Sequence, residues 1–161
     1  RPLPGVAIRI DAEGHLLVRP PNAAVGIDDR RDDDGFIDTG DIASVDEDGF
    51  VWIDGRVSDL INRGGNKVFP DSVEEVLRLH SSVIDAAVVG VPDDRLGEVP
   101  VAFIVGDKFT EEVLIEHCRT HLVAYKIPVA FRSIDQLPRS EVGKILRRVL
   151  IDFWLNEQID S

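Results

Sequence analysis

The sequence has one cysteine among 161 residues, no methionine, and no apolar run near the ~20 residues needed to cross a bilayer. Cys118 therefore has no partner for an internal disulfide, and its amphipathic, helix-like surroundings favour a buried, inert thiol. The first residues lack the basic and then apolar pattern of a secretory signal. These absences predict a globular cytoplasmic protein without a transmembrane segment. Because the chain opens on Arg1 rather than methionine, we expect a fragment or a processed product.

Basic residues are also scarce. The sequence holds 18 Lys and Arg against 30 Asp and Glu, for a net charge of -12. This balance disfavours general binding to nucleic acid, because a phosphate backbone rewards clustered cations. Residues 28–54 carry eleven acids against two arginines, whereas residues 136–150 carry four bases against one acid. The acidic run DDRRDDDG at 28–35 is typical of a solvated, mobile loop. Because the chain as a whole is acidic, an anionic ligand must be bound by a local basic site.

The hydrophobic pattern divides the chain near residue 57. Residues 1–57 contain short apolar segments separated by turn residues, which predicts a β-rich piece with too few apolar residues for a large core. Its strands are expected at residues 5–10, 15–20 and 49–54. Residues 58–161 interleave strand and helix patterns, which predicts a compact α+β domain.

The second part of the chain shows strand-like runs, a glycine-opened loop and helical periodicities. Strands are expected at 57–62, 83–91, 98–106 and 130–134, the loop at 64–70, and helices at 71–80, 110–122 and from about 142 onward. Ser72 and Glu75 have the spacing of a capping box. The last helix carries an apolar stripe that we expect to be buried, made of Ile145, Leu146, Val149, Leu150, Phe153 and Trp154.

The segment DTGD, residues 38–41, is the first of three that could carry chemistry. A carboxylate on a glycine-containing turn can accept hydrogen bonds from two vicinal hydroxyls, so Asp41 is a candidate ribose ligand. An aspartate that only stabilises a turn is the commoner case, and this segment taken alone favours it.

The second segment, GRVSDLINRGGNKVFP, covers residues 55–70. Arg56 offers a planar fork of donors suited to ribose, phosphate or carboxylate oxygens. Gly64 and Gly65 allow a ligand or another backbone to approach closely, and Lys67 adds a charge on a long side chain. A hairpin with a glycine turn and solvated cations explains this segment equally well when it is taken alone.

The third segment, PRSEVGKILRR, covers residues 138–148. Gly143 keeps the backbone open before Lys144, whose long side chain is a cation at neutral pH and can reach a neighbouring site. The segment lacks the glycine spacing and the following Ser or Thr of a P-loop, which excludes that motif. A solvated lysine near a helix start is the common alternative for an isolated Gly-Lys pair.

Taken together and in this order, the motifs resemble the C-terminal portion of the adenylate-forming enzymes. This superfamily comprises acyl- and aryl-CoA synthetases, peptide-synthetase adenylation domains and firefly-type luciferases. The matching segments are FIDTGD, DEDGFVWIDGRVSDLINRGGNKVFPDSVEEVL, AAVVGVPDDRLGEVPVAFIV and LPRSEVGKILRR. The form GGNKVFPDSVEE is closer to an acyl- or aryl-CoA ligase than to a peptide-synthetase domain, where an Arg-Gly-x-Arg-Ile-Glu pattern is expected.

The resemblance implies an ATP-dependent ligase that activates a carboxylic acid as acyl-AMP and transfers it to CoA. Residues 58–161 would form its C-terminal lid, and residues 1–57 the β-rich end of its own N-terminal adenylation domain. The phosphate loop, acyl pocket and Thr-Glu pair that help bind Mg²⁺ and ATP in the family have no counterpart here. We therefore expect no metal site on this chain and no activity from the chain by itself.

Three residues match positions that serve adenylation in the family. Asp41 matches the acid that binds the ribose hydroxyls of ATP, and Arg56 matches the arginine that contacts the same nucleotide. Lys144 matches the lysine that bridges the substrate carboxylate and the α-phosphate. A positioned cation lowers the Coulomb cost when one anion attacks another.

Other residues match positions that serve thioester formation. Gly64 and Gly65 match the glycine loop that lines the pantetheine tunnel, and Lys67 is a candidate CoA contact. In such enzymes the lid rotates between two states that present the lysine or the glycine loop. Its pivot corresponds to Ser58, where the family usually has Asp or Lys.

Two other interpretations stay open at this point. An enzyme of the same superfamily could hand the acyl group to a carrier protein instead of CoA. A stand-alone binding module could also keep the fold without catalysis.

Overall fold

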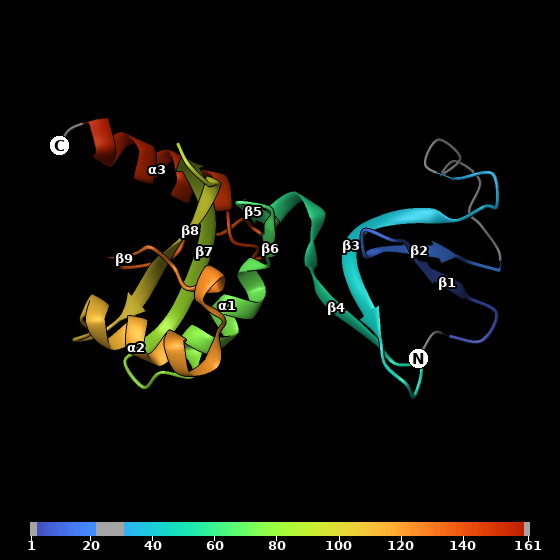
Figure 1. Ribbon diagram of the computed structural model, residues 1–161, viewed down its shortest axis with the longest axis horizontal. Coiled ribbons are helices and arrows are strands. Elements are labelled where there is room, and N and C mark those ends of the chain that lie inside the picture. Colours follow the sequence, from blue (N-terminus) through green and yellow to red (C-terminus); the bar gives the residue numbers. More distant parts are fainter. Residues whose placement is uncertain (1–2, 22–30, 160–161) are drawn as a thin grey trace. The chain divides into compact units, whose positions relative to one another are not determined.

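The computed structural model describes residues 3–21 and 31–159 (Figure 1). It contains two compact units, Arg1–Ser58 and Asp59–Ser161. Strands dominate the first unit, and the second combines strands with helices, which confirms the predicted α+β class. None of the helices in the described part of the chain has the length and apolar character of a membrane span.

The first unit is one antiparallel sheet in the strand order β1-β2-β3-β4. Its strands are β1 (Ala7–Ile10), β2 (His15–Arg19), β3 (Ile37–Val45) and β4 (Val51–Arg56). Three of them confirm predicted strands, whereas β3 was not predicted. The segment DTGD lies inside β3, where Gly40 has a φ of 73° and the pairing with β4 shifts between Ile42 and Ala43. A glycine that bends a strand rather than ending it explains why the turn interpretation missed this element.

The acidic run at 28–35 falls partly outside the described residues. In the described part, the Asp32 Oδ1 atom accepts hydrogen bonds from the backbone N–H groups of Phe36 (2.8 Å) and Asp34 (3.1 Å). Asp32 also pairs with Arg9. These bonds, led by the one from Phe36, hold the pKa of Asp32 below its usual value. Asp32, Asp33 and Asp34 are exposed, as predicted for a solvated loop, and the Asp32 side chain in addition closes the turn onto its own backbone.

The second unit is built on a five-stranded sheet in the order β6-β5-β8-β7, with β9 parallel to β8. Its strands are β5 (Ile61–Arg63), β6 (Asn66–Val68), β7 (Val83–Asp93), β8 (Gly97–Gly106) and β9 (Ala130–Ser133). Its α-helices are α1 (Pro70–Arg78), α2 (Glu111–His121) and α3 (Arg147–Ile159). The 3-10 turn η3 (Ala124–Lys126) also belongs to this unit, and η2 (Val57–Asp59) contains the last two residues of the first unit and the first residue of the second.

Two apolar cores cover the two faces of this sheet. Ala86 and Val88 of β7 belong to the core beneath α1 and α2, whereas Ala87 and Val89 belong to the core beneath α3. This alternation is the period of two expected for a strand that is buried on both faces. Cys118 lies in the first core as predicted, fully buried.

The glycine pair forms the hairpin turn that the sequence left open, but the bounds of the neighbouring elements differ from the prediction. Val57–Asp59 is a 3-10 turn rather than the start of a strand, and Asn66–Val68 is a strand rather than a loop. β5 and β6 form a hairpin that aligns Ile61 with Val68, both buried, and Arg63 with Asn66. The two glycines between them supply positive φ angles of 58° and 87°, which a two-residue hairpin turn requires.

The predicted capping box at the start of α1 is wrong. Phe69 is the N-cap and makes no side-chain capping bond, while the Ser72 hydroxyl donates to the Phe69 carbonyl at 2.8 Å. Pro70 opens the helix, and its ring presets the first helical φ without needing an N–H partner.

The last helix begins later than predicted. It starts at Arg147 rather than near 142, and Val142 is 81% exposed. Within the expected apolar stripe, Leu150 is fully buried and Trp154 packs partly against the second core, whereas Phe153 is 46% exposed. The prediction of a uniformly buried stripe is therefore wrong: Leu146 precedes the helix, and Val149 and Phe153 lie inside it but are exposed.

Candidate functional site

The turn that carries Lys144 is closely hydrogen-bonded. The Ser140 N–H donates to the Lys144 carbonyl at 2.8 Å, and the Lys144 N–H donates to the Ser140 hydroxyl at 3.2 Å. The Leu146 N–H donates to the Pro138 carbonyl at 2.8 Å and closes the base of the turn. Gly143 has a φ of 82°, a conformation that suits glycine. The Lys144 backbone is thus fixed, while its exposed ammonium has no ion-pair partner among the described residues.

Asp41 and Arg56 lie opposite each other on β3 and β4. The Asp41 Oδ1 atom is 2.7 Å from the Arg56 Nε atom, and Arg56 Nη1 also donates to the Thr39 carbonyl at 3.4 Å. The Arg56 side chain is 57% exposed, against 19% for Asp41. The structure therefore brings together the two residues predicted to contact ATP and leaves part of the guanidinium accessible.

Gly64, Gly65 and Lys67 share the β5–β6 hairpin. A Cβ atom at Gly64 would lie 3.0 Å from the Leu96 side chain, whereas one at Gly65 would meet nothing within 4 Å. The Gly64 N–H donates to the Leu96 carbonyl at 2.7 Å. One glycine thus permits a close approach of two loops, and the other leaves open backbone at the tip of the hairpin. Lys67 is exposed on β6, opposite Asn62.

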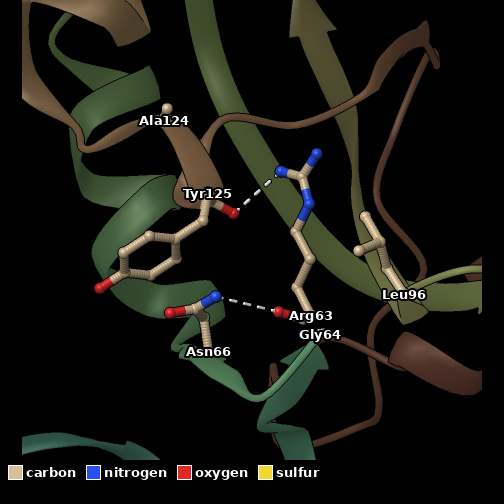
Figure 2. Close-up of a pocket in the computed structure, with 6 residues that line it drawn as sticks. All are labelled: Arg63, Gly64, Asn66, Leu96, Ala124 and Tyr125. Carbon is tan, nitrogen blue, oxygen red and sulfur yellow. Dashed lines mark hydrogen bonds between the residues drawn. The ribbon is translucent and has the colours of Figure 1, made fainter.

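A pocket of about 300 Å³ lies beside this hairpin (Figure 2). Figure 2 shows the Arg63 side chain between Tyr125 and Leu96, with its guanidinium donating to the Tyr125 carbonyl at 2.9 Å. Asn66 donates to the Arg63 carbonyl at 3.4 Å. The lining residues are Arg63, Gly64, Asn66, Leu96, Ala124 and Tyr125. The pocket combines a cation, an amide and apolar side chains. Of its lining residues, only Gly64 was predicted from the sequence as a site residue.

The predicted residues therefore fall into three groups. Asp41 and Arg56 form one pair in the first unit, the glycine hairpin belongs to the second unit, and Lys144 lies in a separate turn of that second unit. Ser58 is the last residue of the first unit and lies in η2. Within residues 3–21 and 31–159, no cluster of three or more His, Cys, Asp or Glu side chains is arranged to hold a metal ion.

Arg147 is a residue that the sequence interpretation passed over. It pairs with Asp59 at 3.1 Å and Asp71 at 2.9 Å, and also pairs with Glu74. Two features of the sequence could have pointed to Arg147: it lies three residues after Lys144, and the acid Glu74 lies within the apolar face of α1, where a basic partner is needed. These contacts tie the end of the Lys144 segment to the body of the second unit.

Comparison with known proteins finds similarity to part of several CoA ligases and to a domain of AMP-binding enzymes. Residues 72–144 match the family described as AMP-binding enzyme C-terminal domain. Over 156 residues the chain is 43% identical to a long-chain-fatty-acid–CoA ligase of Yersinia pestis, covering 92% of this chain and 28% of that protein. Over 153 residues it is 41% identical to a 2-succinylbenzoate–CoA ligase of Bacillus cereus, covering 91% of this chain and 32% of that protein. The chain spans about a third of the length of these relatives.

Solved structures give the same result. The o-succinylbenzoate CoA synthetase of Bacillus subtilis, in complex with its acyl-adenylate intermediate, matches with a TM-score of 0.84 and 33% identity. That match covers 93% of this chain and 34% of the synthetase. The ATP-bound MatB of Rhodopseudomonas palustris matches with a TM-score of 0.85 and 32% identity, over 94% of this chain and 34% of MatB.

Proposed function

Because the chain belongs to the adenylate-forming enzymes and carries their AMP-binding C-terminal domain, we propose that it serves as the lid of an ATP-dependent acyl- or aryl-CoA ligase. The observation that carries this proposal is the state of Lys144. Its backbone is held by reciprocal bonds with Ser140, while its exposed ammonium has no partner in the described part of the chain. A cation held in this way is suited to a ligand that arrives from outside the lid.

The first half-reaction is the formation of acyl-AMP. A carboxylate oxygen of the acid attacks the α-phosphorus of ATP, the bond from that phosphorus to the bridging oxygen breaks, and pyrophosphate leaves. Both reactants are anions, so the ammonium of Lys144 placed between them offsets their repulsion as charge moves to the leaving group. Lys144 neither takes nor gives a proton in this step.

Asp41 and Arg56 would hold the nucleotide during this step. The Asp41 carboxylate is suited to the two ribose hydroxyls, and the accessible part of the Arg56 fork is suited to neighbouring oxygen atoms. Their mutual ion pair at 2.7 Å sets the direction of both groups before ATP binds. Since the described residues offer no cluster for a metal, we assign the Mg²⁺ that accompanies ATP to the remainder of the enzyme.

The second half-reaction transfers the acyl group to CoA. The thiol sulfur attacks the acyl carbon, the bond from that carbon to the AMP oxygen breaks, AMP leaves, and the thiol proton passes to solvent. The open backbone at Gly65 would let the narrow pantetheine arm pass, with Lys67 near the CoA phosphates. Two faces of one lid would thus serve the two steps in turn, rotating about Ser58.

CoA is favoured over a carrier protein as the acceptor. The relatives and solved structures named above include CoA ligases that act on a long-chain fatty acid and on 2-succinylbenzoate. These acids differ in shape, so the family alone does not select one for this chain.

An assay of the complete enzyme tests the proposal. It would be incubated with ATP and a panel of carboxylic acids, with either CoA or a phosphopantetheinyl carrier protein, and AMP and acyl thioester would be measured. We expect acid-dependent AMP release and acyl-CoA, and no turnover by the 161-residue chain alone. If the acyl group is transferred only to the carrier protein, the carrier replaces CoA as the proposed acceptor. If no acid-dependent AMP is formed, the ligase function is wrong and the non-catalytic binding module is the remaining interpretation.

A further inference from the structure

Arg147, at the start of α3, is a partly buried residue with several acidic partners. Its side chain is 16% exposed, and its three nitrogen atoms each contact a different carboxylate: one is Asp59 in η2, and the other two are Asp71 and Glu74 in α1. The Nε atom contacts Asp59, Nη2 contacts Asp71, and Nη1 contacts Glu74 and also donates to the Val88 carbonyl at 2.9 Å. Every nitrogen atom of the planar guanidinium thus makes a polar contact, an arrangement that a lysine ammonium could not reproduce.

The Glu74 carboxylate makes these contacts costly to disturb. Glu74 is 2% exposed, and the Val88 N–H donates to its Oε1 atom at 2.8 Å. Burial by itself would lower the pKa of Arg147, but the hydrogen bond and charge of Glu74 raise it overall, with a further contribution from Asp59. These directional contacts fix the first turn of α3 against α1 and β7.

Only two residues separate Arg147 from Lys144. One of them, Leu146, closes the base of the Lys144 turn through its bond to Pro138, and the other, Ile145, bridges to Arg139. On the far side of the turn, Arg139 donates to the Gly143 carbonyl at 2.8 Å and pairs with Asp85 of β7. Both ends of the Lys144 turn are thus fastened to the sheet and α1 by arginine side chains.

We propose that Arg147 is a positioning residue for Lys144, because it fixes the Lys144 turn to the lid through its three carboxylate contacts. This inference rests on the proposed function of Lys144 in adenylation. The contact with Asp59 also links the Lys144 turn to the proposed pivot. Asp59 is the first residue of the second unit and directly follows Ser58, so Arg147 connects the Lys144 turn to the residue next to the point about which the lid would rotate.

The first test compares two neighbouring arginines in the complete enzyme. R147K keeps a positive charge beside Glu74 but loses the fork, whereas R148K changes an exposed side chain of the same turn of helix. Amide hydrogen exchange would be followed by mass spectrometry in residues 138–146 and in β7 and β8. We expect faster exchange in 138–146 for R147K alone, with unchanged exchange in the sheet.

The second test separates the two half-reactions. We expect R147K to slow pyrophosphate release by roughly tenfold or more, as small misplacements of a reacting group do, and to alter thioester formation from supplied acyl-AMP far less. R148K should match the parent enzyme in both. D59N breaks one contact of Arg147 without leaving a buried charge. It should therefore speed amide exchange in residues 138–146 and slow pyrophosphate release, each by less than R147K does.

A double variant, R147M/E74Q, covers the case in which R147K does not fold, because it removes the charges of Arg147 and Glu74 together, and the other partner of Glu74, Arg78, is 38% exposed. Equal exchange in 138–146 and equal adenylation for R147K and R148K would overturn the proposal. A K144A variant, measured alongside, separates this outcome from a failure of the proposed function. If K144A leaves adenylation unchanged, the role of the lysine is overturned, whereas a slow K144A beside a normal R147K overturns only the role of Arg147.

Discussion

Asp41 and Arg56 form an ion pair across the β3–β4 ladder, with the carboxylate oxygen 2.7 Å from the guanidinium Nε atom. Their Cα atoms are register partners, so the hairpin itself brings these two residues together. Asp41 is the more buried of the two. The pair is therefore a preorganised group at the end of a sheet rather than two surface charges that meet by chance.

Asp41→Asn tests the nucleotide role of this pair. The substitution keeps the size of the side chain but removes the charge, so it weakens hydrogen bonds from the ribose hydroxyls. We expect the KM for ATP in the complete enzyme to rise roughly tenfold to a hundredfold, the range for lost hydrogen bonds to charged groups. Glu47→Gln, at an exposed position in the turn after β3, is the matched control. An unchanged KM in the Asp41 variant would remove this residue from the ATP site.

Gly65→Leu tests the open backbone of the glycine hairpin. We expect slower thioester formation from supplied acyl-AMP, with little change in pyrophosphate release, because the added side chain would occupy the path of the pantetheine arm. Gly49→Leu is a matched control, since Gly49 also has a positive φ and a Cβ atom added there would meet nothing within 4 Å. Both variants bear similar backbone strain. Equal thioester rates for the two variants would exclude the hairpin from the CoA path.

Ser58→Pro tests the pivot. Proline fixes φ near −65°, and the 3-10 turn Val57–Asp59 is a conformation that accepts this angle. We expect the lid to favour one of its two states, so that one half-reaction is retained and the other falls at least about tenfold. Ser58→Ala, which leaves φ free, should slow neither step. If both half-reactions of the proline variant keep their parent rates, lid motion does not depend on this residue.

Cys118 gives the fold a pH dependence. Burial raises the pKa of its thiol to about 11, from 9.0 for an accessible thiol. The folded state therefore retains this proton where the unfolded state loses it, so the stabilisation is complete below pH 9 and is lost as the pH rises toward 11.

Denaturant unfolding of the parent chain and Cys118→Ala at several values between pH 8 and 11 measures this effect. We expect the free energy of unfolding of the parent to fall by about 2 kcal/mol more than that of the variant over this range. The difference between the two curves removes the contribution of other groups that titrate there. Parallel curves would show that Cys118 does not contribute.

Several elements could be predicted because a local signal and the tertiary environment agree. The strands β7 and β8 are continuous apolar runs, which suits a sheet buried on both faces. Thr110 caps α2 by accepting a hydrogen bond from the Val113 N–H, as its place before a helical period suggests.

Other elements could not be predicted because they depend on contacts that are distant in the sequence. Gly40 suggests a turn, yet pairing on both sides keeps β3 a strand. The start of α3 is set by Arg147, whose three acidic partners lie 73 to 88 residues earlier in the chain. The resemblance to the ligases selected Lys144, whereas the residue that holds its turn became visible only from the contacts.

The role of Lys144 is tested most directly by the rate of each half-reaction in the complete enzyme carrying Lys144→Ala, beside Arg148→Ala as a control for loss of an exposed cation. We expect pyrophosphate release to fall by more than about a hundredfold while thioester formation from supplied acyl-AMP changes much less. Equal loss in both half-reactions, or no loss in either, would contradict the role of Lys144 as the cation of adenylation.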